Sequence, residues 1–240
     1  TLTRVYPTAN VEMVGPSFSR IFETAGKSFS KFKHVIEPRW SYGFLGAFDD
    51  QNRVAQFDEI DLLNPSNIAE VALINRLLAR PADATMGGAF EIASFELAQA
   101  YSFDDEQPLQ RSRDGQTSDQ ASAIFAKVRF NPSRAFSLQA QAAYNTLFTG
   151  LDSTSLSGTA RLPRGSLGLT WFTRYAAESY NDPGRSDTLS DQVRFNFGVD
   201  ILPKRLRLDG QVNYDVENGD IQQQRYFLNY LSQCWSVQLE

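Results

Sequence analysis

A strict alternation of apolar and polar side chains runs from Arg205 to Val216, in the stretch RLRLDGQVNYDV. One register holds Leu206, Leu208, Gly210, Val212, Tyr214 and Val216, and the other holds Arg205, Arg207, Asp209, Gln211, Asn213 and Asp215. Because successive side chains of a β-strand point to opposite faces, this pattern predicts a strand with one dry face and one wet face. The dry face could line the core of a soluble sheet or contact the hydrocarbon of a membrane.

The same alternation recurs along most of the chain. It is found in residues 31–44, 122–130, 136–145, 166–175, 192–201 and 225–233. Each run is roughly 9 to 12 residues long, the length that a tilted strand needs to cross a bilayer. The sequence therefore predicts an all-β fold of antiparallel strands.

The connections between these runs also alternate, in this case in length. Short turns are expected at residues 131–134, 163–165, 203–204 and 232–234, and longer polar loops at residues 104–120, 147–155, 176–190 and 217–224. In an up-and-down membrane barrel, short turns face the periplasm and long loops face outside. The pattern favours a transmembrane β-barrel, with a soluble β-sandwich or lipocalin-like barrel as the alternative.

Bulk composition is compatible with a barrel and argues against other classes. The chain has 240 residues, 42% of them hydrophobic, and no run of 18 apolar residues that would predict a membrane-spanning helix. Strands that alternate apolar with polar residues keep average hydropathy low even in a membrane protein. The net charge of −5 and the lack of a basic block argue against a nucleic-acid partner.

The free energy of burying charge then predicts which register faces the lumen. An Arg or Lys that faces lipid at the bilayer midplane costs about 2–4 kcal/mol. The residues expected to line the lumen are Lys127, Arg129, Gln139, Gln141, Arg194, Asn196, Arg207, Asp209, Gln211 and Asn213. Those expected to face lipid are Leu138, Trp171, Phe195, Phe197, Leu206, Val212 and Tyr214.

The chain contains few residues of the types that catalytic and metal sites use. It has one Cys and one His, which removes two-His zinc sites and CxxC motifs. His34 lies in register with apolar neighbours, so we expect a structural role for it. The pairs Glu37–Arg39 and Arg207–Asp209 are interpreted as salt bridges of the lumen wall, because acid–base catalysis would need a cleft and a second acid nearby. We expect neither an enzyme nor a cofactor.

Three motifs resemble the LptD family of LPS-assembly proteins. The segment KHVIEPRWSYGF, residues 33–44, resembles a strand of that family with the pattern HxxxPxxxYxY. Residues 56–80 resemble its acidic FD loop followed by an Asn-Arg pair, here Asn75 and Arg76, although LLARPAD replaces the usual Gly-x-Asp-Arg run. The segment YLSQCWSVQLE, residues 230–240, resembles the family's last strands, where Cys precedes an aromatic residue.

The resemblance implies a large outer-membrane barrel that inserts lipopolysaccharide (LPS) into the outer leaflet. LPS would arrive over a periplasmic LptA-like jellyroll bridge, an LptE-like lipoprotein would plug the lumen, and outer-membrane lipids would surround the barrel. Residues 1–240 would form part of that single barrel domain, without the N-terminal jellyroll, the first strands or the closing strands. The alternatives are a general porin or substrate-specific transporter, and an outer-membrane enzyme with a site at one rim.

Cys234 lies in one of the expected short turns, hence at the periplasmic rim. It is either a lone thiol or one half of a disulfide whose partner lies outside the chain, since an odd Cys in an exported protein points to an absent partner. In the family, such a Cys pairs with a Cys near the jellyroll. We therefore expect a disulfide from Cys234 to a residue beyond these 240.

Overall fold

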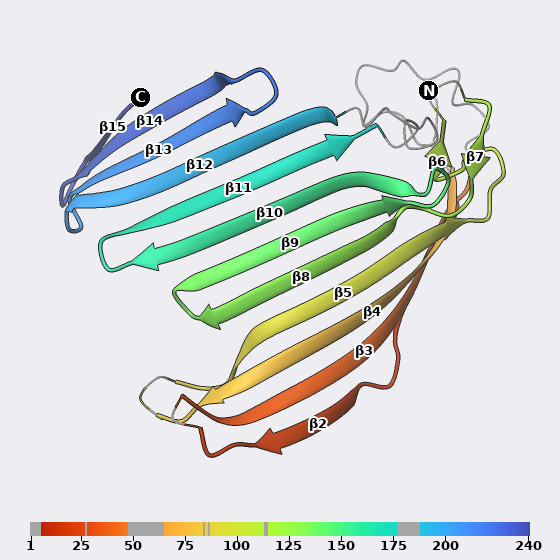
Figure 1. Ribbon diagram of the computed structural model, residues 1–240, viewed down its shortest axis with the longest axis horizontal. Coiled ribbons are helices and arrows are strands. Elements are labelled where there is room, and N and C mark those ends of the chain that lie inside the picture. The colour runs from red at the N-terminus through yellow and green to blue at the C-terminus, as the bar shows by residue number, and fades with distance from the viewer. Residues whose placement is uncertain are drawn as a thin grey trace.

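A computed structural model describes residues 6–26, 28–47, 65–83, 85, 87–112, 115–176 and 188–240. The described residues form one antiparallel 13-stranded sheet and a separate two-stranded hairpin (Figure 1). The prediction of an all-β, up-and-down architecture is confirmed. No helix among the described residues is long and apolar enough to cross a membrane.

The strands follow one another in the sheet in nearly the order in which they occur in the chain. Strands β1 (Thr8–Val14) and β2 (Phe18–Glu23) both pair with β3 (Phe29–Leu45). The sheet continues through β4 (Ser66–Pro81), β5 (Phe90–Ser102), β8 (Ile124–Ser133), β9 (Phe136–Asn145), β10 (Gly150–Leu162), β11 (Gly165–Tyr175), β12 (Thr188–Leu202), β13 (Leu206–Asp215), β14 (Asp220–Leu231) and β15 (Ser236–Leu239). The hairpin of β6 (Gln110–Arg111) and β7 (Ser118–Asp119) lies between β5 and β8.

One rim of the sheet carries the short turns that the sequence predicts. These turns join β8 to β9, β10 to β11, β12 to β13 and β14 to β15, and the first three lie at the left in Figure 1. We call this end of the strands the short-turn rim and the opposite end the long-loop rim. The connection from β5 to β8, residues 103–123, lies at the long-loop rim and is long, as expected.

Two of the predicted long loops are wrong. Strands β9 and β10 are joined by residues 146–149, and β13 and β14 by residues 216–219. The rest of the predicted loops 147–155 and 217–224 lies within β10 and β14, where polar residues follow one another and hide the alternation. Most of the predicted loop 176–190 and the acidic FD stretch lie outside the described residues.

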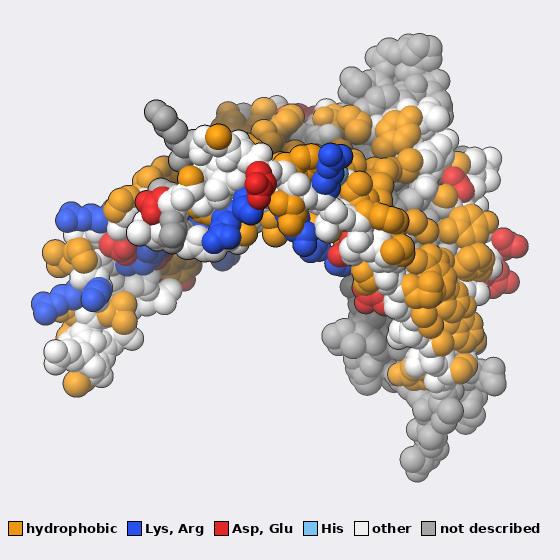
Figure 2. Space-filling view, turned by 90° about the horizontal axis from the view of Figure 1, so that it is seen from below, with side chains coloured by type: hydrophobic (Ala, Val, Ile, Leu, Met, Phe, Trp, Pro, Cys, Tyr) orange, Lys and Arg blue, Asp and Glu red, His pale blue; other side chains and the backbone are white. Residues whose placement is uncertain are grey.

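The sheet is a single curved layer with almost no interior. Figure 2 shows a deep arch with hydrophobic side chains massed on the outside of its right-hand limb. The buried apolar residues among those described are mostly small: Ala69, Ala72, Ile74, Ala79 and Ile92. Large apolar side chains are instead exposed, with Leu169 at 52% and Val71 at 59%. A soluble two-layer sandwich would cover this face with a second sheet, so the single layer argues against that alternative.

The described sheet is open. Strands β1 and β2 form one edge, β15 forms the other, and β14 beyond its short pairing with β15 is also at that edge. Each edge strand leaves backbone N–H and C=O groups without a ladder partner in the sheet.

Candidate functional site

The two registers predicted for β13 occupy opposite faces of the whole sheet. Residues paired across antiparallel strands share a face, so the pairing carries the assignment from strand to strand. Arg194 lies opposite Asn213, and Asn196 lies opposite Gln211. All ten residues predicted to line a lumen share one face, which we call the polar face: Lys127, Arg129, Gln139, Gln141, Arg194, Asn196, Arg207, Asp209, Gln211 and Asn213.

The opposite, apolar face carries all seven residues predicted to contact lipid: Leu138, Trp171, Phe195, Phe197, Leu206, Val212 and Tyr214. Phe195 lies opposite Val212, and the Phe195 and Phe197 rings are 5.8 Å apart. His34 also lies in the apolar register, opposite Leu77.

Each face has exceptions that the sequence pattern did not predict, Phe172 and Asp191 among them. Phe172 lies in the polar register, opposite Gln192 and Ser155. Asp191 lies in the apolar register near the long-loop rim, where its Oδ1 accepts hydrogen bonds from Trp171 Nε1 at 2.6 Å and Thr173 Oγ1 at 3.2 Å. The two bonds satisfy this oxygen on a face where most side chains are apolar.

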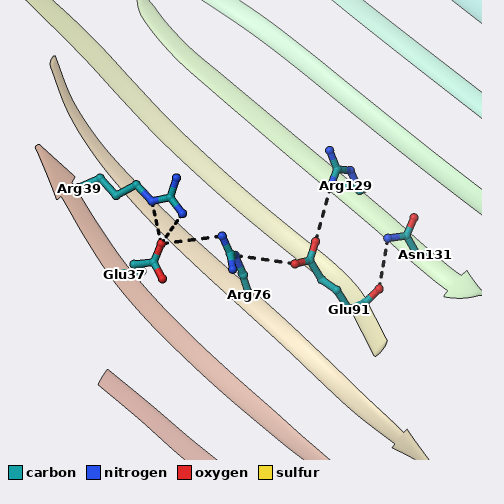
Figure 3. A network of polar contacts seen from close by, with 6 residues as sticks. All are labelled: Glu37, Arg39, Arg76, Glu91, Arg129 and Asn131. Atoms are coloured by element: carbon teal, nitrogen blue, oxygen red, sulfur yellow. Dashed lines mark hydrogen bonds and ion pairs between the residues drawn. The ribbon is translucent and has the colours of Figure 1, made fainter. Parts of the chain in front are cut away.

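A chain of alternating charges crosses the first half of the polar face (Figure 3). Glu37 Oε1 accepts from Arg39 Nε at 2.7 Å and lies 3.8 Å from Arg76 Nη2 on the next strand. Glu91 lies 3.8 Å from both Arg76 Nε and Arg129 Nη1. We call Glu37, Arg39, Arg76, Glu91 and Arg129 the N-terminal ladder; it links β3, β4, β5 and β8.

Glu91 reaches this ladder because of a β-bulge. Leu77 pairs with Ala93 but Leu78 pairs with Glu91, so Ile92 is the extra residue of β5. Without the bulge, Glu91 would share the apolar face with Ala93, because residues two apart in a strand point the same way. A bulge shifts the register by one and re-aims the side chains beyond it, which brings the Glu91 carboxylate between two arginines.

A second group of charges, the C-terminal ladder, lies on β12, β13 and β14. Arg207 Nε donates to Asp209 at 2.8 Å, and Arg207 Nη1 donates to Asp200 Oδ1 at 3.1 Å. Asn229 Nδ2 donates to Asp209 Oδ2 at 3.2 Å. Gly198 lies beside this group, where a Cβ would collide with Arg207 Nη2 and meet Asp209 Oδ1 at 2.6 Å. The glycine therefore leaves the room that the ion pair occupies.

Amides and hydroxyls fill the polar face between the two ladders. Gln139 and Gln141 of β9 lie opposite Ser157 and Ser155 of β10, and Ser157 lies opposite Thr170 of β11. Arg129 Nη2 donates to Gln139 Oε1 at 3.4 Å, which joins the N-terminal ladder to this region. Polar or charged side chains thus occur on this face in each strand of the sheet from β3 to β14.

Ion pairs and hydrogen bonds engage many of the charged groups of this face. The carboxylates of Glu37, Glu91, Asp200 and Asp209 each contact an arginine. Within the described parts of the chain, no group of three or more His, Cys, Asp or Glu side chains could hold a metal ion.

The two salt bridges predicted from spacing are confirmed, whereas the contacts that extend the first of them into the N-terminal ladder were not predicted. Glu37–Arg39 and Arg207–Asp209 are both ion pairs, at 2.7 and 2.8 Å. In the sequence, Arg76 stands out only as part of a motif, and no pattern distinguishes Glu91. The near-continuous apolar run IAEVALI of β4 hides the alternation that would have marked Arg76.

Cys234 lies in the turn between β14 and β15, at the short-turn rim as predicted. Its thiol is exposed and free in this structure. A disulfide to a residue beyond the chain therefore stays a prediction.

Comparison with known proteins gives the family. No curated protein matches the chain. The model of one protein family, LptD, described as LPS transport system D, matches residues 1–204. The match includes the motifs at residues 33–44 and 56–80 and ends before the Cys-containing motif at residues 230–240. Because it covers most of the chain, the protein belongs to the LptD family.

Proposed function

We propose that this chain forms part of the wall of an outer-membrane β-barrel that inserts LPS into the outer leaflet. The observation that carries the proposal is the two-faced single layer: one exposed apolar face, and one polar face crossed by Arg–carboxylate ladders, in a member of the LptD family. The role is transport without chemical catalysis.

The apolar face supports a membrane location. Contiguous apolar patches of more than a few hundred Å² are rare on soluble monomers, yet exposed Leu, Phe and Val side chains extend over this face from β4 to β14. The hydrocarbon of a bilayer would cover it with no second protein layer. The polar face would then enclose a water-filled lumen.

The ladders support a lumen wide enough to be wet. Arg39, Arg76 and Arg129 keep 37%, 37% and 40% of their side chains exposed. Charges in a closed, dry core would incur a desolvation penalty of several kcal/mol each. A hydrated lumen that admits a plug of LptE type and the sugar part of LPS avoids that penalty.

The open edges support a larger barrel. Unpaired backbone groups cost several kcal/mol each in hydrocarbon, so two bare edges would exceed the roughly 5–15 kcal/mol that stabilises a domain. We propose that further strands complete the sheet, and that the short-turn rim faces the periplasm, where an LptA-like bridge would deliver LPS.

The proposal is tested in cells that depend on a regulated copy of the full-length protein. Depletion should reduce the LPS that an outer-leaflet acylating enzyme or an antibody can reach at the cell surface, while total LPS stays constant. Re-expression of the wild-type protein should restore it. If surface LPS is unchanged and the purified protein instead makes liposomes permeable to small sugars, a porin function replaces this one.

A further inference from the structure

A hollow opens on the apolar face at the short-turn rim. It has a volume of about 660 Å³, and six of its lining residues carry the argument: Phe29, Pro81, Asp83, Phe90, Pro132 and Arg134. Phe90 pairs with Ala79, which pairs with Phe32 in the apolar register. The Phe29 ring lies 5.5 Å from Phe32 and 6.2 Å from Phe90. The hollow is therefore an apolar recess where the strands end, in the size range of small-molecule sites.

Arg134 holds a positive charge at the mouth of this hollow. Its Cζ lies 5.6 Å from the centre of the Phe90 ring, and its Nη2 donates to Gly88 O at 3.0 Å. Gly87, at φ 88°, also leaves room for it, since a Cβ there would lie 3.0 Å from both Nη atoms. Among the described residues, no carboxylate forms an ion pair with Arg134. The guanidinium is thus positioned but not neutralised.

Asp83 supplies a negative charge to the same hollow. Its Oδ1 accepts hydrogen bonds from the Thr85 N–H at 2.8 Å and the Thr85 hydroxyl at 2.7 Å. These bonds lower the pKa of the Asp83 carboxyl, so it stays ionised at neutral pH. Within the part of the chain that the structure describes, its Oδ2 accepts no hydrogen bond and the carboxylate forms no ion pair with Arg134.

We propose that this hollow binds a glycerophospholipid whose headgroup carries both a phosphate and a primary ammonium. The phosphate would accept hydrogen bonds from Arg134, the ammonium would donate to Asp83 Oδ2, and an acyl chain would pack on Phe29 and Phe90. The inference rests on the proposed membrane location, with the short-turn rim in the periplasmic leaflet.

The charge pattern selects this headgroup over its relatives. A headgroup with net negative charge would satisfy Arg134 but offer no cation to Asp83. A quaternary ammonium has no N–H to donate to the carboxylate. Charge-assisted hydrogen bonds are the stronger class, so the primary amine should be preferred over both.

The test uses the full-length protein in nanodiscs of phosphatidylcholine that contain a phospholipid with a photoactivatable acyl chain. Phosphatidylethanolamine should label residues around Phe29 and Phe90 several-fold more than phosphatidylglycerol or phosphatidylcholine probes do. Arg134→Gln should remove the excess label. Asp83→Asn should keep the acceptor for Thr85 and lose only the preference for ethanolamine over glycerol.

Arg164→Gln is the matched control, because Arg164 is also an exposed arginine in a turn of the same rim but does not line the hollow. It should leave labelling unchanged. If Arg134→Gln fails to fold, the expected loss of the preference for ethanolamine over glycerol in Asp83→Asn still tests the inference. Equal labelling by the three probes at the hollow, or equal effects of Arg134→Gln and Arg164→Gln, would overturn the inference. Failure of the proposed membrane location would look different: residues such as Leu169 and Phe195 would then receive no label from any lipid.

Discussion

The Glu37–Arg39 pair should contribute measurably to stability, whereas an exposed ion pair of the same sheet should not. Glu37 keeps only 14% of its side chain exposed and accepts from Arg39 Nε at 2.7 Å. A hydrogen bond to a charged group contributes about 1.5–3 kcal/mol. Since Arg39 is 37% exposed, solvent screening lowers this value, and we expect a coupling free energy of about 1–2 kcal/mol between the two residues.

The assay is a double-mutant cycle on the full-length protein, with Glu37→Gln, Arg39→Gln and the double variant. Unfolding in urea from lipid vesicles, followed by tryptophan fluorescence, gives the free energy of unfolding of each. A coupling of this size corresponds to a roughly 5- to 30-fold change in the unfolding equilibrium constant.

The control is the Glu23–Lys31 pair, whose nitrogen–oxygen distance is also 2.7 Å but whose side chains are 76% and 48% exposed. The cycle of Glu23→Gln and Lys31→Gln should give a coupling that cannot be distinguished from zero, because water screens the charges. Equal coupling free energies in the two cycles would refute this reasoning. They would mean that the partial burial of Glu37 does not determine how much its ion pair contributes to stability.

Three further predictions follow from the two faces, the turn at Cys234 and the open edges. Leu169→Arg should destabilise the protein in membranes by about 2–4 kcal/mol, as measured by urea unfolding, whereas Thr170→Arg on the polar face should have little effect; equal losses would contradict the face assignment. Cys234 should be oxidised in the mature full-length protein, so that non-reducing electrophoresis shows a mobility shift that Cys234→Ser abolishes, and alkylation of the thiol without reductant would count against the disulfide. Residues 1–240 expressed alone and refolded in detergent should give no heat-modifiable, protease-resistant species, because both edges of the sheet are open. A compact, heat-modifiable monomer would mean that the strands close on themselves, and it would favour the porin alternative.

The sequence predicted the faces wherever one register is dry and the other wet. In β13, Arg207, Asp209 and Gln211 alternate with Leu208 and Gly210, and a shift by one residue would place every charge on the apolar side. Only one assignment of the two registers keeps the charged side chains of β13 away from lipid, and the pairing of β12 with β13 agrees with that assignment.

The sequence could not predict contacts that depend on register between distant strands. Arg76 and Arg129 meet at Glu91 only because a bulge at Ile92 moves Glu91 onto the polar face. The parity of its position within β5 suggests the opposite face. The hollow at the short-turn rim likewise forms where the ends of β3, β4, β5 and β8 come together. No pattern within a single segment of the sequence predicts that.

The loop lengths predicted from the sequence are wrong where strands carry polar residues on both faces. Asp152 to Ser155 and Gln222 to Gln224 lie within strands, although an unbroken polar run is typical of a loop. Backbone hydrogen bonds to the neighbouring strand hold such residues in the sheet whatever the polarity of their side chains.

The central claim is that the apolar face contacts lipid and the polar face contacts water. It is tested most directly by nitroxide labels at successive positions of β13, from Leu206 to Tyr214, in the full-length protein in lipid bilayers. Collision with oxygen should peak at Leu206, Val212 and Tyr214, and collision with a water-soluble nickel chelate should peak at Arg207, Gln211 and Asn213. The reverse pattern, or equal accessibility along the strand, would contradict the account.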